Sequence, residues 1–153
     1  MNKKLLGVKF LERCEKMMIN LMDGFDKHLD PEKKILLLEE CGRKCIHDRH
    51  KKLIQDAKSL YKNSNDMKEF LGKLSKIYDS LQITKEEVAF IWDKCYCPVI
   101  NKIPAGKISP TFCNCSRGWV KELLETAIEK PVEVILEETV TKGNSRCKLR
   151  VLI

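Results

Sequence analysis

The chain has 153 residues with a net charge of +7 at pH 7, and 33% of its residues are charged. That length fits one domain, and a hydrophobic share of 43% can build a core without disulfides. No apolar run approaches the roughly 18 residues of a membrane span, and charges interrupt the opening residues too early for a secretory signal. We therefore expect a cytoplasmic protein that does not enter a membrane.

The basic balance raises the question of a nucleic-acid partner. Lysines are spread along the chain rather than gathered in a run, and no basic stripe is interleaved with aromatic residues. Nucleic-acid binding needs such a concentrated positive surface. The charge pattern therefore does not favour this partner class.

The first half of the chain predicts helices. Apolar residues at spacings of three and four predict a first helix that ends at Gly24. Asp30 and Pro31 begin a second helix, with a possible break at residues 47–50 before helix continues to Tyr61. After a turn at residues 63–66, another amphipathic helix extends to Leu81. The apolar residues of the first helix are Leu6, Phe10, Cys14, Met17 and Leu21.

The second half predicts strands. Alternation from Val88 to Trp92 is typical of a strand, although a helix capped by Thr84 competes for this segment. Ser116 is a suitable N-cap for a helix that stops at Pro131, and residues 132–140 and 146–153 predict a β-hairpin. The fold class is therefore α+β. We expect a helical N-terminal half packed on a small antiparallel sheet, with a C-terminal helix and the hairpin.

The domain organisation follows from this layout. We expect a single domain over residues 1–153, with a helical part at 1–83 and a cysteine-containing αβ ligand-binding part at 84–153. The apolar helix faces would also allow a homodimer, but packing in one core explains them equally well.

Eight cysteines give the chain its distinctive chemistry. In an intracellular protein of this size we expect reduced thiols, and clustered thiols indicate metal or redox chemistry. Two pairs have a single intervening residue, Cys95 with Cys97 and Cys113 with Cys115. On an extended chain such partners point to one side, so two pairs would supply a four-thiolate shell for zinc or an iron–sulfur cluster. Redox chemistry and inert packing are the alternatives.

Cys115 is distinguished by its position directly before the predicted N-cap Ser116. Unpaired amides and the positive end of a helix dipole would favour its thiolate there. That environment suits a metal ligand and equally a nucleophile.

Three further cysteines could contribute to the same site. Cys41 and Cys45 are four residues apart and share one face of a helix, and Cys147 lies on the last predicted strand. His47 and His50 face roughly away from Cys41 and Cys45, unless the helix breaks between them. We expect Cys14 to pack in the interior, and Cys147 to pack there as well unless it contributes to the site from its strand.

The C-terminal part resembles a known superfamily. The matching segments are Cys-Asn-Cys-Ser-Arg-Gly-Trp at 113–119, Pro-Val-Glu-Val at 131–134, Gly143, and Cys-Lys-Leu at 147–149. They resemble the 4-vinyl-reductase-type ligand-binding domain and the L-2-amino-thiazoline-4-carboxylate hydrolase-like proteins, over roughly residues 85 to 153. The resemblance implies a small-molecule- or metal-binding domain with cysteines lining the site, Cys147 among them. The doubled cysteine pairs depart from that pattern and indicate a cysteine-rich branch.

Two functions follow from these observations. The first is a sensor or carrier that holds a metal ion or a small thiophilic ligand through its cysteines, with zinc expected and an iron–sulfur cluster or no metal as alternatives. The second is a hydrolase acting on a small heterocycle or amide, with Cys115 as nucleophile or a cysteine-bound metal activating water. Asp93 and Glu122 would be its acid–base candidates. We expect binding rather than catalysis, because a catalytic zinc keeps an open position that four cysteines would fill.

Overall fold

A computed structural model describes the backbone of residues 3–153 and the side chains of residues 11–153. The side chains of Leu6 and Phe10, both part of the predicted first helix, lie outside that range. The elements are α1 (Lys3–His28), α2 (Pro31–Arg49), α3 (Lys51–Lys62), α4 (Met67–Ile77), β1 (Leu81–Ile83), β2 (Val88–Trp92), α5 (Asn114–Ile128), β3 (Glu133–Glu138) and β4 (Cys147–Leu152). Short 3₁₀ helices precede α5 and β4, at Pro110–Cys113 and Val140–Lys142.

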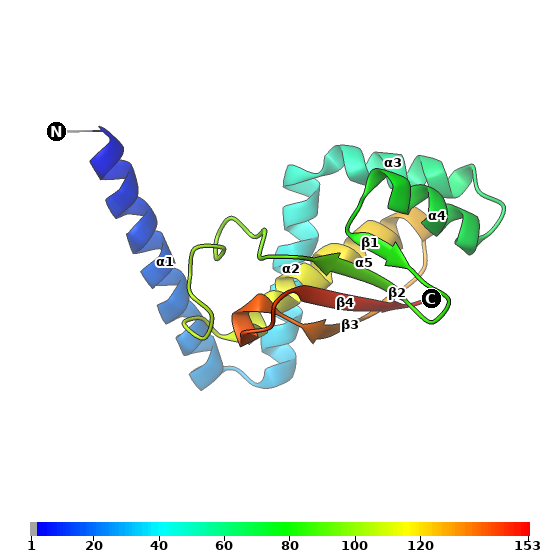
Figure 1. The fold of residues 1–153 in the computed structure, drawn as a ribbon. Helices are drawn as coiled ribbons and strands as arrows, with labels where there is room; N and C mark the ends of the chain where they lie inside the picture. The colour runs from blue at the N-terminus through cyan, green and yellow to red at the C-terminus, as the bar shows by residue number, and fades with distance from the viewer. Residues whose placement is uncertain (1–2) are drawn as a thin grey trace.

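The four strands form one antiparallel sheet in the order β1-β2-β4-β3. Helices α2 to α5 gather around this sheet, whereas the N-terminal end of α1 projects away from the rest of the molecule (Figure 1). The predicted α+β class, the strand at Val88–Trp92 and the antiparallel hairpin of β3 and β4 are confirmed.

The main core lies between the sheet and the helices. Its fully buried side chains come from both halves of the chain, among them Phe70 of α4, Phe90 of β2, Leu123 of α5 and Leu149 of β4. A second apolar cluster joins α1 and α2 to the long segment between β2 and α5, through Met22, Leu38, Ile100, Ile108 and Phe112.

Helices α2 and α5 make an unusually close contact at two glycines. A β-carbon on Gly42 would lie 1.8 Å from the carbonyl oxygen of Cys115, and one on Gly118 would lie 2.0 Å from the carbonyl oxygen of Glu39. Neither position can carry a larger side chain without separating the helices. The glycines therefore set the distance between α2 and the start of α5.

Local sequence explains the helix starts. The Asp30 side chain accepts a hydrogen bond from the backbone N–H of Lys33 (2.9 Å), and Pro31 occupies the first position of α2. Asp66 caps α4 in the same way through the N–H of Glu69 (2.7 Å). The predicted break is present, since α2 ends at Arg49 and α3 begins at Lys51.

Three predicted element boundaries are wrong. Helix α1 continues through Gly24 to His28, because one glycine costs only about 1 kcal/mol and the neighbouring Met22 is buried. The fourth helix stops at Ile77, and Leu81, predicted as helical, begins β1 and pairs with Phe90.

The third correction concerns the helix that carries Cys115. Helix α5 begins at Asn114 rather than after Ser116, because the turn that Ser109 and Pro110 start leads directly into it. The Asn114 side chain donates to the Thr111 carbonyl (2.8 Å) at this junction. Cys115 therefore lies inside the first turn of α5 and not before its cap.

Among the helices of the described chain, none combines the length and the apolar character needed to cross a membrane.

Candidate functional site: a cluster of cysteines

Seven of the eight cysteines lie near one another at the junction of α2, α5 and the sheet. Each is a neighbour of at least one other thiol of the group, and the first turn of α5 lies at its centre. We call these residues the cysteine cluster. They are Cys41, Cys45, Cys95, Cys97, Cys113, Cys115 and Cys147.

Two features of the fold assemble the cluster. The glycine contact holds the cysteine-bearing face of α2 against Cys115. In the sheet, Trp92 at the end of β2 pairs with Cys147 at the start of β4, so the segment leaving β2 with Cys95 and Cys97 starts beside Cys147. The cysteine cluster therefore depends on contacts between distant parts of the sequence.

Cys113 is the most buried member, with 6% of its surface exposed. Its Sγ lies 3.1 Å from Oγ1 of Thr141, and that oxygen lies 3.0 Å from Oγ1 of Thr139. Burial raises the pKa of the Cys113 thiol to about 11; the hydrogen bond to Thr141 opposes this rise, and the nearby Cys147 adds to it. Cys113 is therefore a neutral thiol at physiological pH.

Cys115 has the most strongly perturbed thiol of the cluster. Burial, followed by the charges of neighbouring thiols, raises its pKa to about 12. These neighbours are Cys97, Cys45, Cys41 and Cys113, in order of decreasing effect. The predicted stabilisation of its thiolate by the helix N-terminus is therefore outweighed by desolvation and by like charges.

Cys95 and Cys97 lie in the irregular segment after β2, shielded by apolar residues of the second cluster. Burial raises the pKa of both thiols. Hydrogen bonds from backbone N–H groups lower these pKa values in part. The N–H of Cys97 donates to the Cys95 sulfur, and the N–H groups of Val99 and Ile100 donate to the Cys97 sulfur. Such N–H donors favour a thiolate once a cation compensates for its burial.

The remaining cysteines occupy the edges of the cluster. The Cys147 sulfur accepts a hydrogen bond from the N–H of Val140 at 3.5 Å, and burial raises its pKa. Cys45 is half-buried and Cys41 is exposed. Cys14 lies on α1 and is half-buried, so the expectation that it packs in the interior holds only in part.

The side chains do not form a finished coordination sphere. Over residues 11–153, no group of three or more His, Cys, Asp or Glu side chains is placed so that it could hold a metal ion. The donor set is nevertheless the one that zinc or an iron–sulfur cluster uses, since it consists of thiols, most of them at least partly buried. Binding would require several of these side chains to turn toward a common point.

The two histidines near Cys45 are engaged elsewhere. His47 Nε2 lies 2.6 Å from Oε1 of Glu122, and His50 packs edge-on against the Trp119 ring, with ring centroids 5.5 Å apart. In the same network, Nη1 of Arg43 lies 2.7 Å from Oε2 of Glu122 and 2.7 Å from Oε2 of Glu125. These groups therefore hold α2 against α5.

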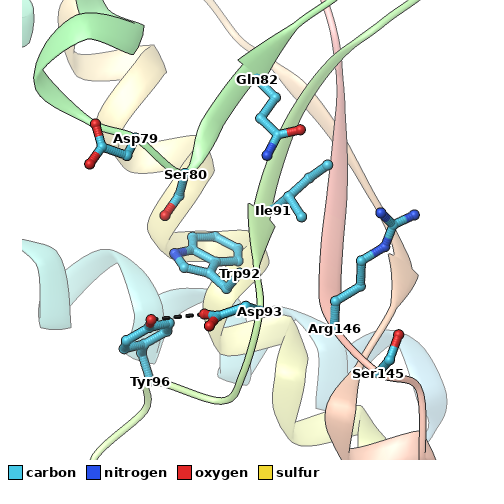
Figure 2. Close-up of a pocket in the computed structure, with 9 residues that line it drawn as sticks. All are labelled: Asp79, Ser80, Gln82, Ile91, Trp92, Asp93, Tyr96, Ser145 and Arg146. Atoms are coloured by element: carbon cyan, nitrogen blue, oxygen red, sulfur yellow. Dashed lines mark hydrogen bonds between the residues drawn. The ribbon is translucent and has the colours of Figure 1, made fainter.

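The acid–base candidates of the hydrolase hypothesis are engaged by groups other than cysteines. Glu122 is held by His47 and Arg43. Asp93 is exposed and accepts a hydrogen bond from the Tyr96 hydroxyl (2.8 Å) on the rim of an open depression of about 440 Å³ (Figure 2). No cysteine lines that depression.

The depression itself is open, is lined by both polar and apolar side chains, and lies at the sheet beside β1 and β2. Gln82 of β1 and Ile91 of β2 line it, and Arg146 lies beside Ile91 (Figure 2). Arg146 is already paired with Glu138, through hydrogen bonds of 3.1 Å and 2.8 Å. The arrangement indicates a solvated surface hollow rather than an enclosed ligand site.

Sequence reasoning missed two parts of the site. The hydroxyls of Thr139 and Thr141, which contact Cys113, are buried although both lie in a segment predicted as strand and turn. The glycine contact was also missed. Its signal was present, since Gly42 directly follows Cys41 and Gly118 lies three positions after Cys115, but only the paired helices show what these glycines meet.

Comparisons with known proteins place the sequence in a family without assigning a function. No curated protein and no solved structure matches the chain. The resemblance to the 4-vinyl-reductase-type domain is not tested by these comparisons and stays a prediction. A family of unknown function, DUF6144, matches residues 11–153. Since this match spans nearly the whole chain, the protein belongs to the DUF6144 family.

Proposed function

We propose that the protein binds a thiophilic metal ion, zinc in the first instance, through thiolates of the cysteine cluster, and that it serves as a sensor or carrier of that ion. The observation that carries this proposal is the gathering of seven cysteines from α2, the segment after β2, the 3₁₀ helix at Pro110–Cys113, α5 and β4. Inert packing would not need so many thiols at one place.

The electrostatics of the cluster support the same function. The thiols that lie close together raise one another's pKa, so several thiolates cannot coexist there without a compensating cation. A metal ion supplies that positive charge, and each ligating thiol then loses its proton to solvent. A small thiophilic molecule is a weaker candidate because it brings no such charge.

The hydrolase alternative draws less support from the same residues. A nucleophilic cysteine is normally activated by a nearby base or a lowered pKa, whereas burial and neighbouring thiols raise the pKa of Cys115. Asp93 and Glu122, its proposed acid–base partners, are hydrogen-bonded to Tyr96 and to His47 and Arg43 rather than to a thiol. We therefore favour binding over catalysis.

The test is element-specific metal analysis of protein purified without oxygen, together with its ultraviolet–visible spectrum. We expect zinc and a colourless protein, whereas a coloured sample with iron would assign an iron–sulfur cluster to the same thiols. Cys14→Ser is the matched control, because Cys14 lies outside the cluster, and it should retain all the metal. Metal-free protein that gains no metal on incubation with zinc would contradict the proposal.

A further inference from the structure

We propose that the cysteine cluster is divided into two metal subsites, each for one thiophilic cation. This inference rests on the proposed function and refines the simpler expectation of one four-thiolate site. The helical subsite consists of Cys41, Cys45, Cys97 and Cys115. The sheet subsite consists of Cys95, Cys113 and Cys147.

The division begins with the backbone around Cys113 and Cys115. The expectation of a shared ion assumed an extended chain, on which residues two apart point to the same side. The structure instead places Cys113 at the end of a 3₁₀ helix and Cys115 in the first turn of α5. On a helix, positions i and i+2 face in different directions, so these two sulfurs diverge.

The contacts of the two residues show where each is directed. Cys113 approaches Thr141, which precedes β4, with its Sγ 3.1 Å from the threonine Oγ1. Cys115 lies against α2, where its carbonyl oxygen blocks any β-carbon on Gly42. One residue therefore faces the sheet and the other lies beside the helix that carries Cys41 and Cys45.

The other cysteines follow the same division. Cys41 and Cys45, four apart on α2, share the face that meets Cys115. Cys147 is the first residue of β4 and lies close to both Cys113 and Cys95. For Cys113 the neighbouring thiols are Cys147 and Cys95. Cys115 is influenced first by Cys97, then by Cys45 and Cys41 of α2, and least by Cys113.

Ligand number points the same way. A structural zinc takes four ligands in a tetrahedral arrangement, so a single ion would leave three of the seven thiols of the cluster without a role. Two ions use all seven. Cys95 and Cys97, which are separated by one residue in an irregular segment, connect the two subsites.

The experiment is a titration of the reduced, metal-free full-length chain with Cd²⁺, followed by sulfur-to-cadmium charge-transfer absorption and by ¹¹³Cd NMR. We expect binding to saturate at about two equivalents, with two cadmium resonances. The double variant Cys41→Ser with Cys45→Ser should bind one equivalent fewer and lose one resonance. Cys113→Ser with Cys147→Ser should lose the other, and Cys14→Ser should match the wild-type chain.

The outcomes separate the two proposals. Saturation of the wild-type chain at one equivalent with one resonance would overturn the two-subsite arrangement and leave the metal-binding function intact. The two-subsite arrangement would also be overturned if the Cys41→Ser, Cys45→Ser variant lost both resonances together while its circular dichroism spectrum showed that it is folded. No charge-transfer absorption at any Cd²⁺ concentration would overturn the metal-binding function itself. The wild-type stoichiometry distinguishes one subsite from two even if a double variant does not fold.

Discussion

At the scale of single residues, the environment of Cys113 is the best defined part of the cluster. Its sulfur, the Thr141 hydroxyl and the Thr139 hydroxyl form a short chain of buried polar atoms. Thr139 in turn accepts a hydrogen bond from the N–H of Lys142 (3.3 Å). This chain ties the end of the 3₁₀ helix at Cys113 to the turn that precedes β4.

Thr141→Val tests this chain of hydrogen bonds. The substitution removes a hydroxyl between two buried partners, so we expect the free energy of unfolding to fall by about 1–3 kcal/mol. Thr141→Ser keeps the hydroxyl and should cost only the buried methyl, about 0.8 kcal/mol. Urea unfolding under reducing conditions measures both. Equal losses in the two variants would show that the hydroxyl contributes nothing.

The cysteines illustrate what residue patterns can and cannot predict. Spacing alone singled out Cys95, Cys97, Cys113 and Cys115, with Cys41, Cys45 and Cys147 as further contributors, and the structure brings all seven near one another. The direction of each side chain could not be predicted. It depends on whether the backbone at residues 113–115 is extended or helical, which the 3₁₀ turn from Ser109 decides.

At the scale of elements, the contact between α2 and α5 is the feature on which the cluster depends. Ion pairs lie around the glycine contact: Glu39, which is almost fully buried, pairs with Arg117 and with Lys121 (3.2 Å). The Arg117 Nε and Glu39 Oε1 atoms form this ion pair without hydrogen-bond alignment. Arg43, Glu122 and Glu125 form the second group.

Gly42→Ala should separate the two helices. Its methyl group would collide with the Cys115 backbone, and backbone cannot rotate away as a side chain can. We expect a loss of about 3 kcal/mol or more in the free energy of unfolding, at the upper end of overpacking costs. The variant should also bind metal more weakly, because Cys41 and Cys45 move away from Cys115.

Gly72→Ala is the matched control for this prediction. Gly72 lies in α4, and a β-carbon there meets nothing within 4 Å. Alanine should therefore leave the fold intact and stabilise it by about 0.5–1 kcal/mol. If Gly42→Ala behaved like Gly72→Ala in thermal unfolding, the close approach of α2 and α5 would be refuted.

The Glu122 network predicts how this interface responds to acid. Burial alone would raise the pKa of the Glu122 carboxyl, but hydrogen bonds from His47, Arg43 and Thr126 outweigh it and hold the pKa below its ordinary value. A carboxyl with a lowered folded-state pKa contributes stability above its unfolded pKa of about 4.3. That contribution is lost as pH falls through the folded-state pKa.

Glu122→Gln tests this dependence. The difference in free energy of unfolding between the wild-type chain and the variant should be larger above about pH 5 and should shrink as the solution is acidified below about pH 4. Denaturant unfolding across that range measures it, with Glu40→Gln at an exposed position of α2 as control. A difference that does not change with pH would contradict the assigned role of Glu122.

At the scale of the whole molecule, the cluster exists only in the folded chain. Its cysteines extend from residue 41 to residue 147 and are joined by the helix contact and the β2–β4 pairing. A ligand that binds the folded state and not the unfolded chain stabilises it by about 2.7 kcal/mol at 100 times its dissociation constant. Metal binding and folding should therefore be coupled.

Thermal unfolding with and without zinc measures this coupling. We expect Zn²⁺ to raise the unfolding midpoint of the metal-free chain and a chelator to reverse the rise. Mg²⁺ is the matched control, because it prefers oxygen ligands and should leave the midpoint unchanged. Equal unfolding midpoints in Zn²⁺ and Mg²⁺ would show that metal binding and folding are not coupled.

Much of the architecture could be predicted because it follows from local patterns. Helical spacing and capping residues predict α2 and α4, and alternation predicts β2, β3 and β4. The errors occurred where tertiary packing overrides local preference, at Gly24 within α1 and at Leu81, which pairs with Phe90. The strand β1 also shows that the sheet begins before residue 84, the expected boundary between the two parts of the chain.

The most direct test of the central claim is X-ray absorption at the zinc K-edge of the loaded, wild-type protein. If the cysteine cluster holds the metal, the first shell will consist mainly of sulfur atoms at about 2.3 Å. A first shell of oxygen or nitrogen atoms at about 2.0–2.2 Å would place the ion outside the cluster and contradict the proposed function.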